Sequence, residues 1–141
     1  MKAVNTSGKR KAAIARAVVR RGVGRVRINK KPLELHAPEL ARLKIMEPLV
    51  LAGKPLVESV DIDVVVKGGG VMGRADACRT AIARGLVEYL RVNKPSGSDY
   101  KELEMLYRQT DRSLLVNDPR KKLPKRPMGR GARAKRQKSY R

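Results

Sequence analysis

The chain has 141 residues, with 34 lysines and arginines against 13 aspartates and glutamates, which gives a net charge of +21. Such a charge repels itself unless a polyanion, either nucleic acid or an anionic membrane, neutralises it. The single cysteine excludes an internal disulfide, and no stretch approaches the ~18–20 apolar residues of a membrane span. The first 21 residues also lack a signal-peptide h-region, so we expect an intracellular protein. The length suits one domain with room for an appendage.

Residues 11–30 predict a β-hairpin. The proposed connection, Gly22–Gly24, contains two glycines that tolerate the positive φ of a tight turn. In the second arm, Val26 and Ile28 alternate with arginines, so the aliphatic and the basic side chains occupy opposite faces. The first arm is rich in alanine and is also compatible with a helix.

Residues 36–55 predict two short helices. Pro38 suits a first helical position, and Pro48 interrupts the pattern, so the second helix should end at Gly53. The apolar stripe at helical spacing consists of Leu40, Leu43 and Met46.

Residues 56–67 form the clearest strand pattern in the sequence. The face that we expect to be buried consists of Val60, Ile62, Val64 and Val66. The loop GGGVMG follows, and after it a helix whose apolar positions are Ala75, Cys78, Ile82, Leu86 and Leu90. This strand, loop and helix should form the centre of the domain.

Asp99 and Glu102 resemble a capping box for a further short helix that continues through Tyr107. The sequence SLLV, residues 113–116, is compatible with a last short strand. From Pro119 onwards, prolines and glycines prevent a continuous helix.

The tail that follows contains eleven basic and no acidic residues between Arg120 and Arg141, so the other 119 residues carry a net charge of only +10. It cannot bury enough apolar surface to fold alone. If eight to ten of its charges met phosphates, each would release about 0.7–0.9 counterions. Binding to RNA could therefore order the tail.

The glycine loop satisfies the dinucleotide-binding pattern GxGxxG between a strand and a helix. A dinucleotide fold also requires a second βαβ half and a ribose-binding acid about 20 residues on, where this chain has a loop. Backbone N–H groups at a helix N-terminus bind phosphate on any molecule. An RNA phosphate between Lys67 and Arg74 is therefore one interpretation, and a tight packing turn is the other.

Other candidate residues favour structural roles. Asp61 and Asp63 share a strand face and should pair with nearby arginines rather than form a hydrolase pair or a metal site. Cys78 should lie in the core, and the single histidine, His36, should belong to a turn or a cap. This inventory supports neither a zinc site nor a catalytic triad, so we expect no enzyme activity, cofactor or metal.

Three blocks in this order resemble the universal small-subunit ribosomal protein nine family. They are TSGKRKAAIARAVVRRGVGRVRIN, VVVKGGGVMGRADACRTAIARGLVEYL and LLVNDPRKKLPKRPMGRGARAKRQKSYR, which together cover nearly the whole chain. The KSYR ending is similar to that of the archaeal and eukaryotic branch. Arg74 departs from the family, in which many members carry glutamine.

The resemblance implies an α+β fold, a two-layer α/β sandwich with a mixed sheet and a left-handed βαβ crossover. It implies a globular RNA-binding domain over residues 1–118 and an extended basic tail over residues 119–141. It also implies a structural role in the cytoplasmic ribosome, bound to ribosomal RNA and neighbouring proteins in the head of the small subunit. Through its last residues the protein would contact the anticodon stem-loop of peptidyl-site tRNA.

The expected rRNA-binding residues combine the basic segment near the start, the glycine loop with its flanking cations, and the tail. They are Lys9, Arg10, Lys11, Arg16, Lys67, Gly68, Gly69, Gly70, Arg74, Arg120, Lys121, Lys122, Lys125, Arg126, Arg130, Arg133, Lys135 and Arg136. The tRNA-contacting residues implied by the resemblance are Lys138, Ser139, Tyr140 and Arg141. Two other classes stay open at this point: a chromatin-type DNA-compacting protein, and a small nucleotide-dependent enzyme that rests on GGGVMG alone.

Overall fold

The computed structural model describes residues 2–36, 38–95 and 97–134. Over these residues the chain is an α+β protein with one five-stranded mixed sheet and four helices. The strands are β1 (Val4–Arg10), β2 (Ala13–Arg21), β3 (Val26–Ile28), β4 (Lys31–Pro32) and β5 (Val60–Lys67). The helices are α1 (Glu39–Ala52), α2 (Lys54–Glu58), α3 (Val71–Asn93) and α4 (Asp99–Thr110), with 3₁₀ turns η1 (Leu33–Leu35) and η2 (Arg112–Leu114).

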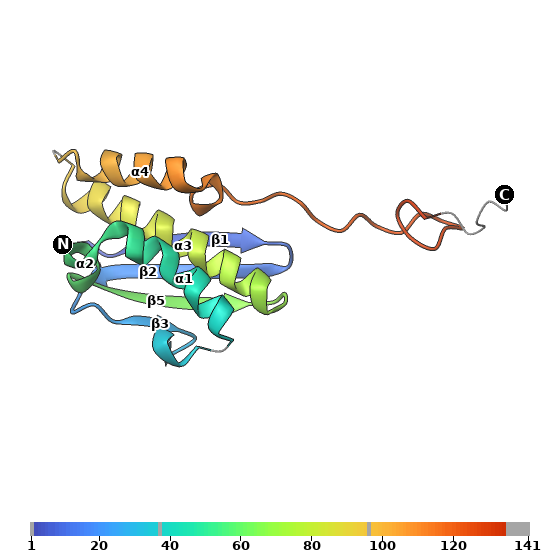
Figure 1. Cartoon of the computed structure of the whole chain (residues 1–141), viewed down its shortest axis with the longest axis horizontal. Coiled ribbons are helices and arrows are strands. Elements are labelled where there is room, and N and C mark those ends of the chain that lie inside the picture. The colour runs from blue at the N-terminus through green and yellow to red at the C-terminus, as the bar shows by residue number, and fades with distance from the viewer. Residues whose placement is uncertain (1, 37, 96, 135–141) are drawn as a thin grey trace.

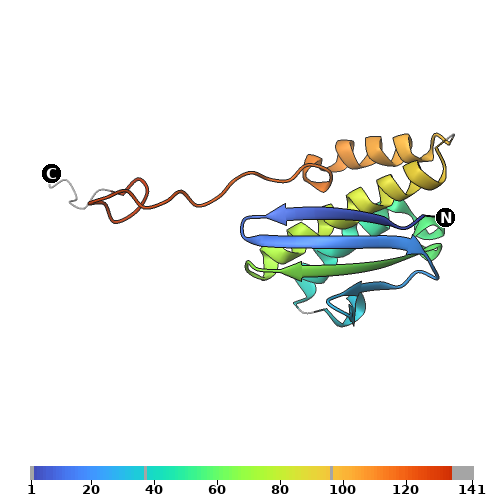
Figure 2. The ribbon, with the colours of Figure 1, turned by 180° about the vertical axis from the view of Figure 1, so that it is seen from behind.

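Helices α1 and α3 lie over one face of the sheet, α4 is stacked on α3 beyond the β1 edge, and the view from behind shows the other face uncovered (Figures 1 and 2). The strand order is β1-β2-β5-β3-β4, in which only the β3–β5 pair is parallel. Helices α1 and α2 therefore lie in the crossover between the parallel strands β3 and β5. The left hand that the resemblance implies for this crossover stays a prediction.

The hairpin predicted for residues 11–30 is wrong. Strand β2 instead pairs with the preceding β1, and β2 and β3 lie on opposite sides of β5. The carboxylate of Asp61 explains the path between them, because its Oδ1 accepts 3.0 Å hydrogen bonds from the backbone N–H groups of Val23 and Arg25. These bonds hold the glycine-containing loop across the start of β5, so β3 emerges on the far side.

Strand β1 has no counterpart in the sequence predictions, since its polar sequence VNTSGKR lacks an apolar alternation. Its small residues serve a different purpose, because α3 packs directly against them. A Cβ on Gly8 would lie 2.8 Å from the backbone N of Ala81 and closer still to the carbonyl oxygen of Ala77. The hydroxyl of Thr6 donates a 2.8 Å hydrogen bond to the carbonyl of Ala81. Direct contact between the backbones of β1 and α3 therefore takes the place of the large apolar side chains that usually pack between a strand and a helix.

The central strand and helix are confirmed. In β5, the predicted residues Val60, Ile62, Val64 and Val66 are buried. In α3, the five predicted positions are also buried, together with the alanines between them. The strand is shorter than predicted, because Leu56–Glu58 belong to α2.

The two helices predicted for residues 36–55 are one helix, α1, which continues through Pro48 and ends at Gly53 as expected. Proline lacks the N–H of a helical hydrogen bond. Here its ring is buried, and its carbonyl oxygen accepts a 2.7 Å hydrogen bond from the hydroxyl of Tyr107 in α4. Burial and this added contact compensate for the missing bond.

Helix α4 is confirmed, but without the expected capping box. Ser98 is the N-cap and makes no side-chain capping bond, while Asp99 pairs with Lys94 at 3.5 Å. The strand predicted from SLLV is wrong, since residues 112–114 form the turn η2. There Asp111 accepts a hydrogen bond from the N–H of Ser113, and Thr80 of α3 donates to the Ser113 carbonyl. These local bonds give the backbone an alternative to a strand.

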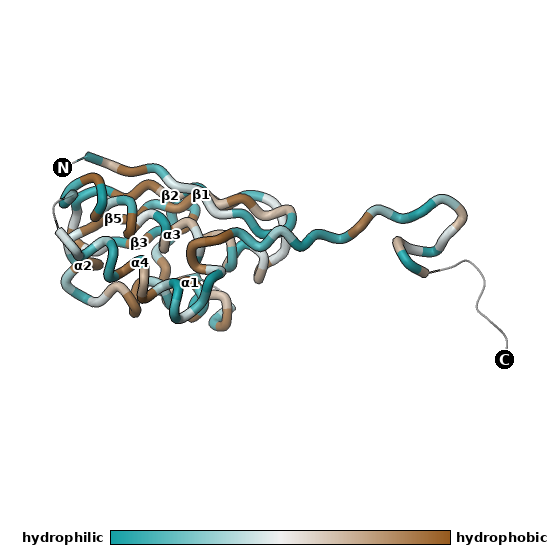
Figure 3. Tube along the Cα trace, turned by 90° about the horizontal axis from the view of Figure 1, so that it is seen from above, coloured by the Kyte–Doolittle hydropathy of each residue, from teal (hydrophilic) through white to brown (hydrophobic). Residues whose placement is uncertain are grey.

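After η2 the described chain, up to residue 134, contains no helix or strand. It leaves the domain as a long extension, and its hydropathy colouring is mostly hydrophilic, whereas apolar residues gather along the strands and helices (Figures 1 and 3). The core therefore ends where the basic segment begins.

Candidate nucleic-acid interface

Two basic blocks that are far apart in the sequence meet at one end of the sheet. The turn after β1 contains Lys11, and β5 ends at Lys67, directly before the loop of Gly68, Gly69 and Gly70. A Cβ on Gly69 would lie 2.8 Å from the Cβ of Ala13, so the loop packs directly on the start of β2. We call this part of the molecule the basic end.

The glycine loop has the backbone of an anion site. Gly68 and Gly69 adopt positive φ values of 73° and 66°, and Gly70 is the N-cap of the 23-residue helix α3. The first helical turn contains no acidic residue, and among the described residues no side chain caps its N–H groups. A helix N-terminus of this kind attracts anions through its free N–H groups and its dipole.

Arg74 braces this loop, because its Nε donates a 3.0 Å hydrogen bond to the carbonyl of Gly68. The guanidinium also places a positive charge beside the loop. Around the same end the exposed lysines are Lys9, Lys11 and Lys67. Together they give the basic end four positive charges around the start of α3.

The tail begins at this same end, and we call the segment that leads into it, residues 115–120, the tail root. The backbone N–H of Lys9 donates a 3.1 Å hydrogen bond to the side-chain oxygen of Asn117. Arg84 of α3 donates to the carbonyl of Leu115 at 2.7 Å and to the carbonyl of Ser7 at 2.8 Å. Burial lowers the pKa of Arg84, yet an arginine keeps its charge. These contacts tie the root of the tail to β1.

Two of the predicted RNA-facing arginines are engaged within the protein. Arg10 pairs with Asp118 at 2.8 Å and with Asp76 at 3.6 Å. Arg120 binds the same carboxylate of Asp118 through two nitrogens. The hydrogen bonds from Arg120 and the charge of Arg10 lower the pKa of Asp118 to about 2. In this structure both arginines therefore position the tail root.

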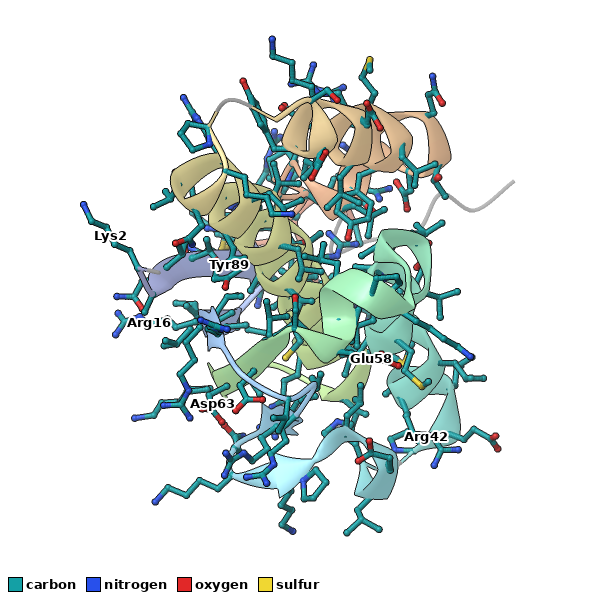
Figure 4. The ribbon with its side chains drawn as sticks, turned by 90° about the vertical axis from the view of Figure 1, so that its left-hand side faces the viewer. Lys2, Arg16, Arg42, Glu58, Asp63 and Tyr89 are labelled. Carbon is teal, nitrogen blue, oxygen red and sulfur yellow. The ribbon has the colours of Figure 1, made fainter. Side chains whose placement is uncertain are left out.

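The other predicted cations face solvent. Arg16 projects from the uncovered sheet face, on the same side as Asp63 and away from Arg42 (Figure 4). The exposed cations of the described tail are Lys121, Lys122, Lys125, Arg126, Arg130 and Arg133. The remaining predicted residues of the chain end lie outside the described residues: Lys135, Arg136, Lys138, Ser139, Tyr140 and Arg141.

The sequence analysis missed the residues that fix the tail root, chiefly Asp118, Asn117 and Arg84. A weak signal was present, because Asn117–Pro119 places an acid and a turn-forming residue directly before an acid-free tail. Arg84 gave none, since an arginine on a long helix is usually solvated.

The remaining candidates have structural roles. Asp63 pairs with Arg20 at 3.0 Å and with Arg27 at 3.3 Å, as expected for a solvated strand face. Hydrogen bonds from the N–H groups of Arg25 and Val23 lower the pKa of Asp61. Cys78 is buried, and burial raises the pKa of its thiol to about 12.

His36 ends the turn η1, where its N–H donates to the carbonyl of Leu33, which fits the predicted turn or capping role. Within the described residues, no group of three metal-ligating side chains comes together. In the same part of the chain, no helix is long and apolar enough to span a membrane. Finally, α3 leads into a loop and α4 rather than into the second βαβ half of a dinucleotide fold.

The fold and the basic end define a small α+β protein whose exposed cations gather around the start of its longest helix. Comparison with known sequences makes the assignment specific. The chain belongs to the ribosomal protein S9/S16 family, whose model matches residues 8–141. It is a structural, non-enzymatic component of the small ribosomal subunit.

Three archaeal proteins, each named small ribosomal subunit protein uS9, are similar to the chain. The protein of Thermoplasma volcanium is 57% identical over 138 residues, which are 98% of both chains. That of Methanothrix thermoacetophila is 53% identical over 141 residues, the full length of both. That of Halobacterium salinarum is 56% identical over 137 residues, 97% of this chain and 98% of the relative. The chromatin-type and enzyme alternatives are therefore set aside.

Proposed function

We propose that this protein binds the ribosomal RNA of the small-subunit head through its basic end and its tail. The observation that carries the proposal is the convergence at one end of the sheet. Four exposed cations, the uncapped start of α3 and the root of the tail lie together there. Scarcity of aromatic residues, four tyrosines with no Phe or Trp, argues against base stacking and favours phosphate contacts.

The tail supplies most of the charge for this binding. Its eleven basic residues are interspersed with glycine, alanine and proline, whose small size lets the backbone approach packed RNA helices. Arginine can bind two phosphate oxygens at once. Because Asp118 engages Arg120, ten tail cations are available for phosphates.

The salt dependence of binding tests this proposal. We compare the full chain with a chain truncated after Asp118, using a fragment of head ribosomal RNA as the probe. With about 0.7–0.9 counterions released per phosphate, ten tail contacts predict a slope of log affinity against log salt that is lower by roughly 7–9 after truncation.

A matched control keeps the composition of residues 121–141 but scrambles their order. We expect its salt slope to equal that of the full chain, because the slope counts charges. Thermal unfolding of the truncated chain should match that of the full chain, which shows that the domain stays folded. Equal slopes for truncated and full chains would contradict an RNA-bound tail.

We also propose that Lys138, Ser139, Tyr140 and Arg141 contact the anticodon stem-loop of peptidyl-site tRNA. The resemblance supports this assignment, as does the reach of the tail, since 22 extended residues span at most about 70 Å. Deleting the four residues should weaken peptidyl-site tRNA retention while subunits still assemble. Replacing them by four glycines provides a length-matched control with the same expected loss. Unchanged tRNA affinity and frame maintenance would refute the contact.

A further inference from the structure

The outer side of α1 carries apolar side chains that no other part of the described structure covers. We call these residues the α1 ridge: Leu40, Leu43, Met46 and Val50, which are 66%, 55%, 37% and 72% exposed. At about 100° per residue, the last three lie opposite the buried Ala41 and Ile45. A helix that is apolar on opposite sides is typical of one covered on both sides.

The charged side chains of α1 are not available to a partner at this ridge, because other groups of the protein already pair with them. Arg42 donates to Glu39 and to the Glu34 carbonyl. Lys44 pairs with Asp76 at 2.6 Å, and Glu47 pairs with Arg79 at 2.8 Å. Since phosphate contacts require available cations, the ridge is unsuited to RNA.

The charge around the ridge is also unlike that of the rest of the molecule. Residues 33–59 contain three basic and four acidic residues, a net charge of −1 in a chain of +21. Exposed carboxylates flank the helix, with Glu34 before it and Glu58 after it. Figure 4 shows Glu58 and Arg42 on the helical side, opposite the basic sheet face that carries Arg16.

A second copy of this chain would be a poor occupant, because two ridges would bring their acidic borders together. A segment that is apolar in the middle and basic at its edges would be complementary in both respects. We propose that the α1 ridge is the docking surface for such a segment of another small-subunit protein. This inference rests on the proposed function, because the proposed function places the chain in the small subunit, where another ribosomal protein can cover the ridge.

Photo-crosslinking in purified small subunits tests the inference. We place p-benzoylphenylalanine at Val50 in one chain and at Met128, in the tail, in another. The Val50 probe should crosslink to a peptide of one other ribosomal protein, and that peptide should be apolar with a net positive charge. The Met128 probe should crosslink to RNA.

Each other result is decisive. If Met128 reaches RNA but Val50 crosslinks to RNA, to a second copy, to an acidic peptide or to nothing, the docking inference is wrong and the proposed function stands. If the chain is absent from subunits, or Met128 reaches no RNA, the proposed function fails and the inference fails with it.

Substitutions give an independent measurement. The ridge variant combines Leu43→Gln with Val50→Gln, and its control combines Val92→Gln with Met105→Gln, which are also exposed apolar residues. Both should unfold at the wild-type temperature and bind the RNA fragment equally. In salt-washed subunits, the ridge variant should be retained about tenfold more weakly, the effect expected from loss of one interface anchor. Equal retention of both variants would overturn the inference.

Discussion

The glycine loop permits a test in which stability and RNA binding change in opposite directions. Gly69 is unsuited to it, because its positive φ and its contact with Ala13 would strain any side chain. Gly70 has a negative φ of −86°, and a Cβ there would meet no atom of the described residues within 4 Å. We therefore compare Gly70→Asp with Gly70→Ala.

The structure sets the expected sizes. Gly70 is the N-cap of α3, a position where aspartate exceeds glycine by a few tenths of a kcal/mol and the helix dipole adds about 0.3–1 kcal/mol. Gly70→Asp should thus raise the unfolding free energy by about 0.5–1 kcal/mol. Alanine, a poor cap, should lower it by about 0.5–1 kcal/mol.

RNA binding should follow the reverse order. A carboxylate about 5 Å from a bound phosphate costs roughly 1–3 kcal/mol at an effective dielectric constant between about 20 and 80, which is about five- to 150-fold in affinity. Gly70→Ala should bind within about twofold of wild type. Thermal unfolding and titration with a head RNA fragment at 0.1 M salt provide both values. If the stabilised Gly70→Asp protein bound the RNA fragment with wild-type affinity, the loop would be a packing turn that does not bind phosphate.

Two further predictions concern packing and pH. Gly8→Ala should destabilise the domain by about 1–3 kcal/mol in urea unfolding, because the alanine Cβ would press β1 away from α3. Gly97→Ala is the control, since a Cβ there would have its nearest neighbour at 3.6 Å. Equal unfolding midpoints for the two variants would contradict this packing. The pKa of Asp118, lowered to about 2, lies below its unfolded value, so its stabilisation of the tail root should be complete above about pH 4 and be lost as the pH falls from there through 2. Chemical shifts of Asn117 and Arg120 should report this transition, and a midpoint near pH 4 would refute the contacts.

Regular patterns in the sequence predicted the central elements well. The alternation in β5 and the helical spacing in α3 both identify a face that is buried, because one periodicity dominates each segment. The loop between them was located from its run of glycines. Local sequence therefore sufficed where a segment packs through one apolar face.

The failures have physical causes that a local reading could not detect. Strand β1 is stabilised by pairing with β2 and by close contact of Gly8 with α3, neither of which leaves an apolar alternation. The order of β2, β5 and β3 depends on a long-range interaction, in which Asp61 holds the loop after β2. Long-range pairing of this kind is invisible in a window of ten residues.

The candidate site shows the same division. Basic blocks were easy to find, but their meeting at one end of the sheet required the register of β2 against β5. Nor does composition distinguish an available cation from an engaged one. Arg10 and Lys9 are adjacent in sequence, yet Arg10 holds the tail root and Lys9 faces solvent.

The path of residues 119–134 in an assembled small subunit, determined by electron cryomicroscopy, tests the account most directly. We expect the tail to leave the basic end and run between ribosomal RNA helices, with the side chains of Lys121, Lys125 and Arg130 within about 4 Å of phosphate oxygens. A tail folded over its own domain and distant from RNA would contradict the claim that RNA neutralises the surplus charge of this protein.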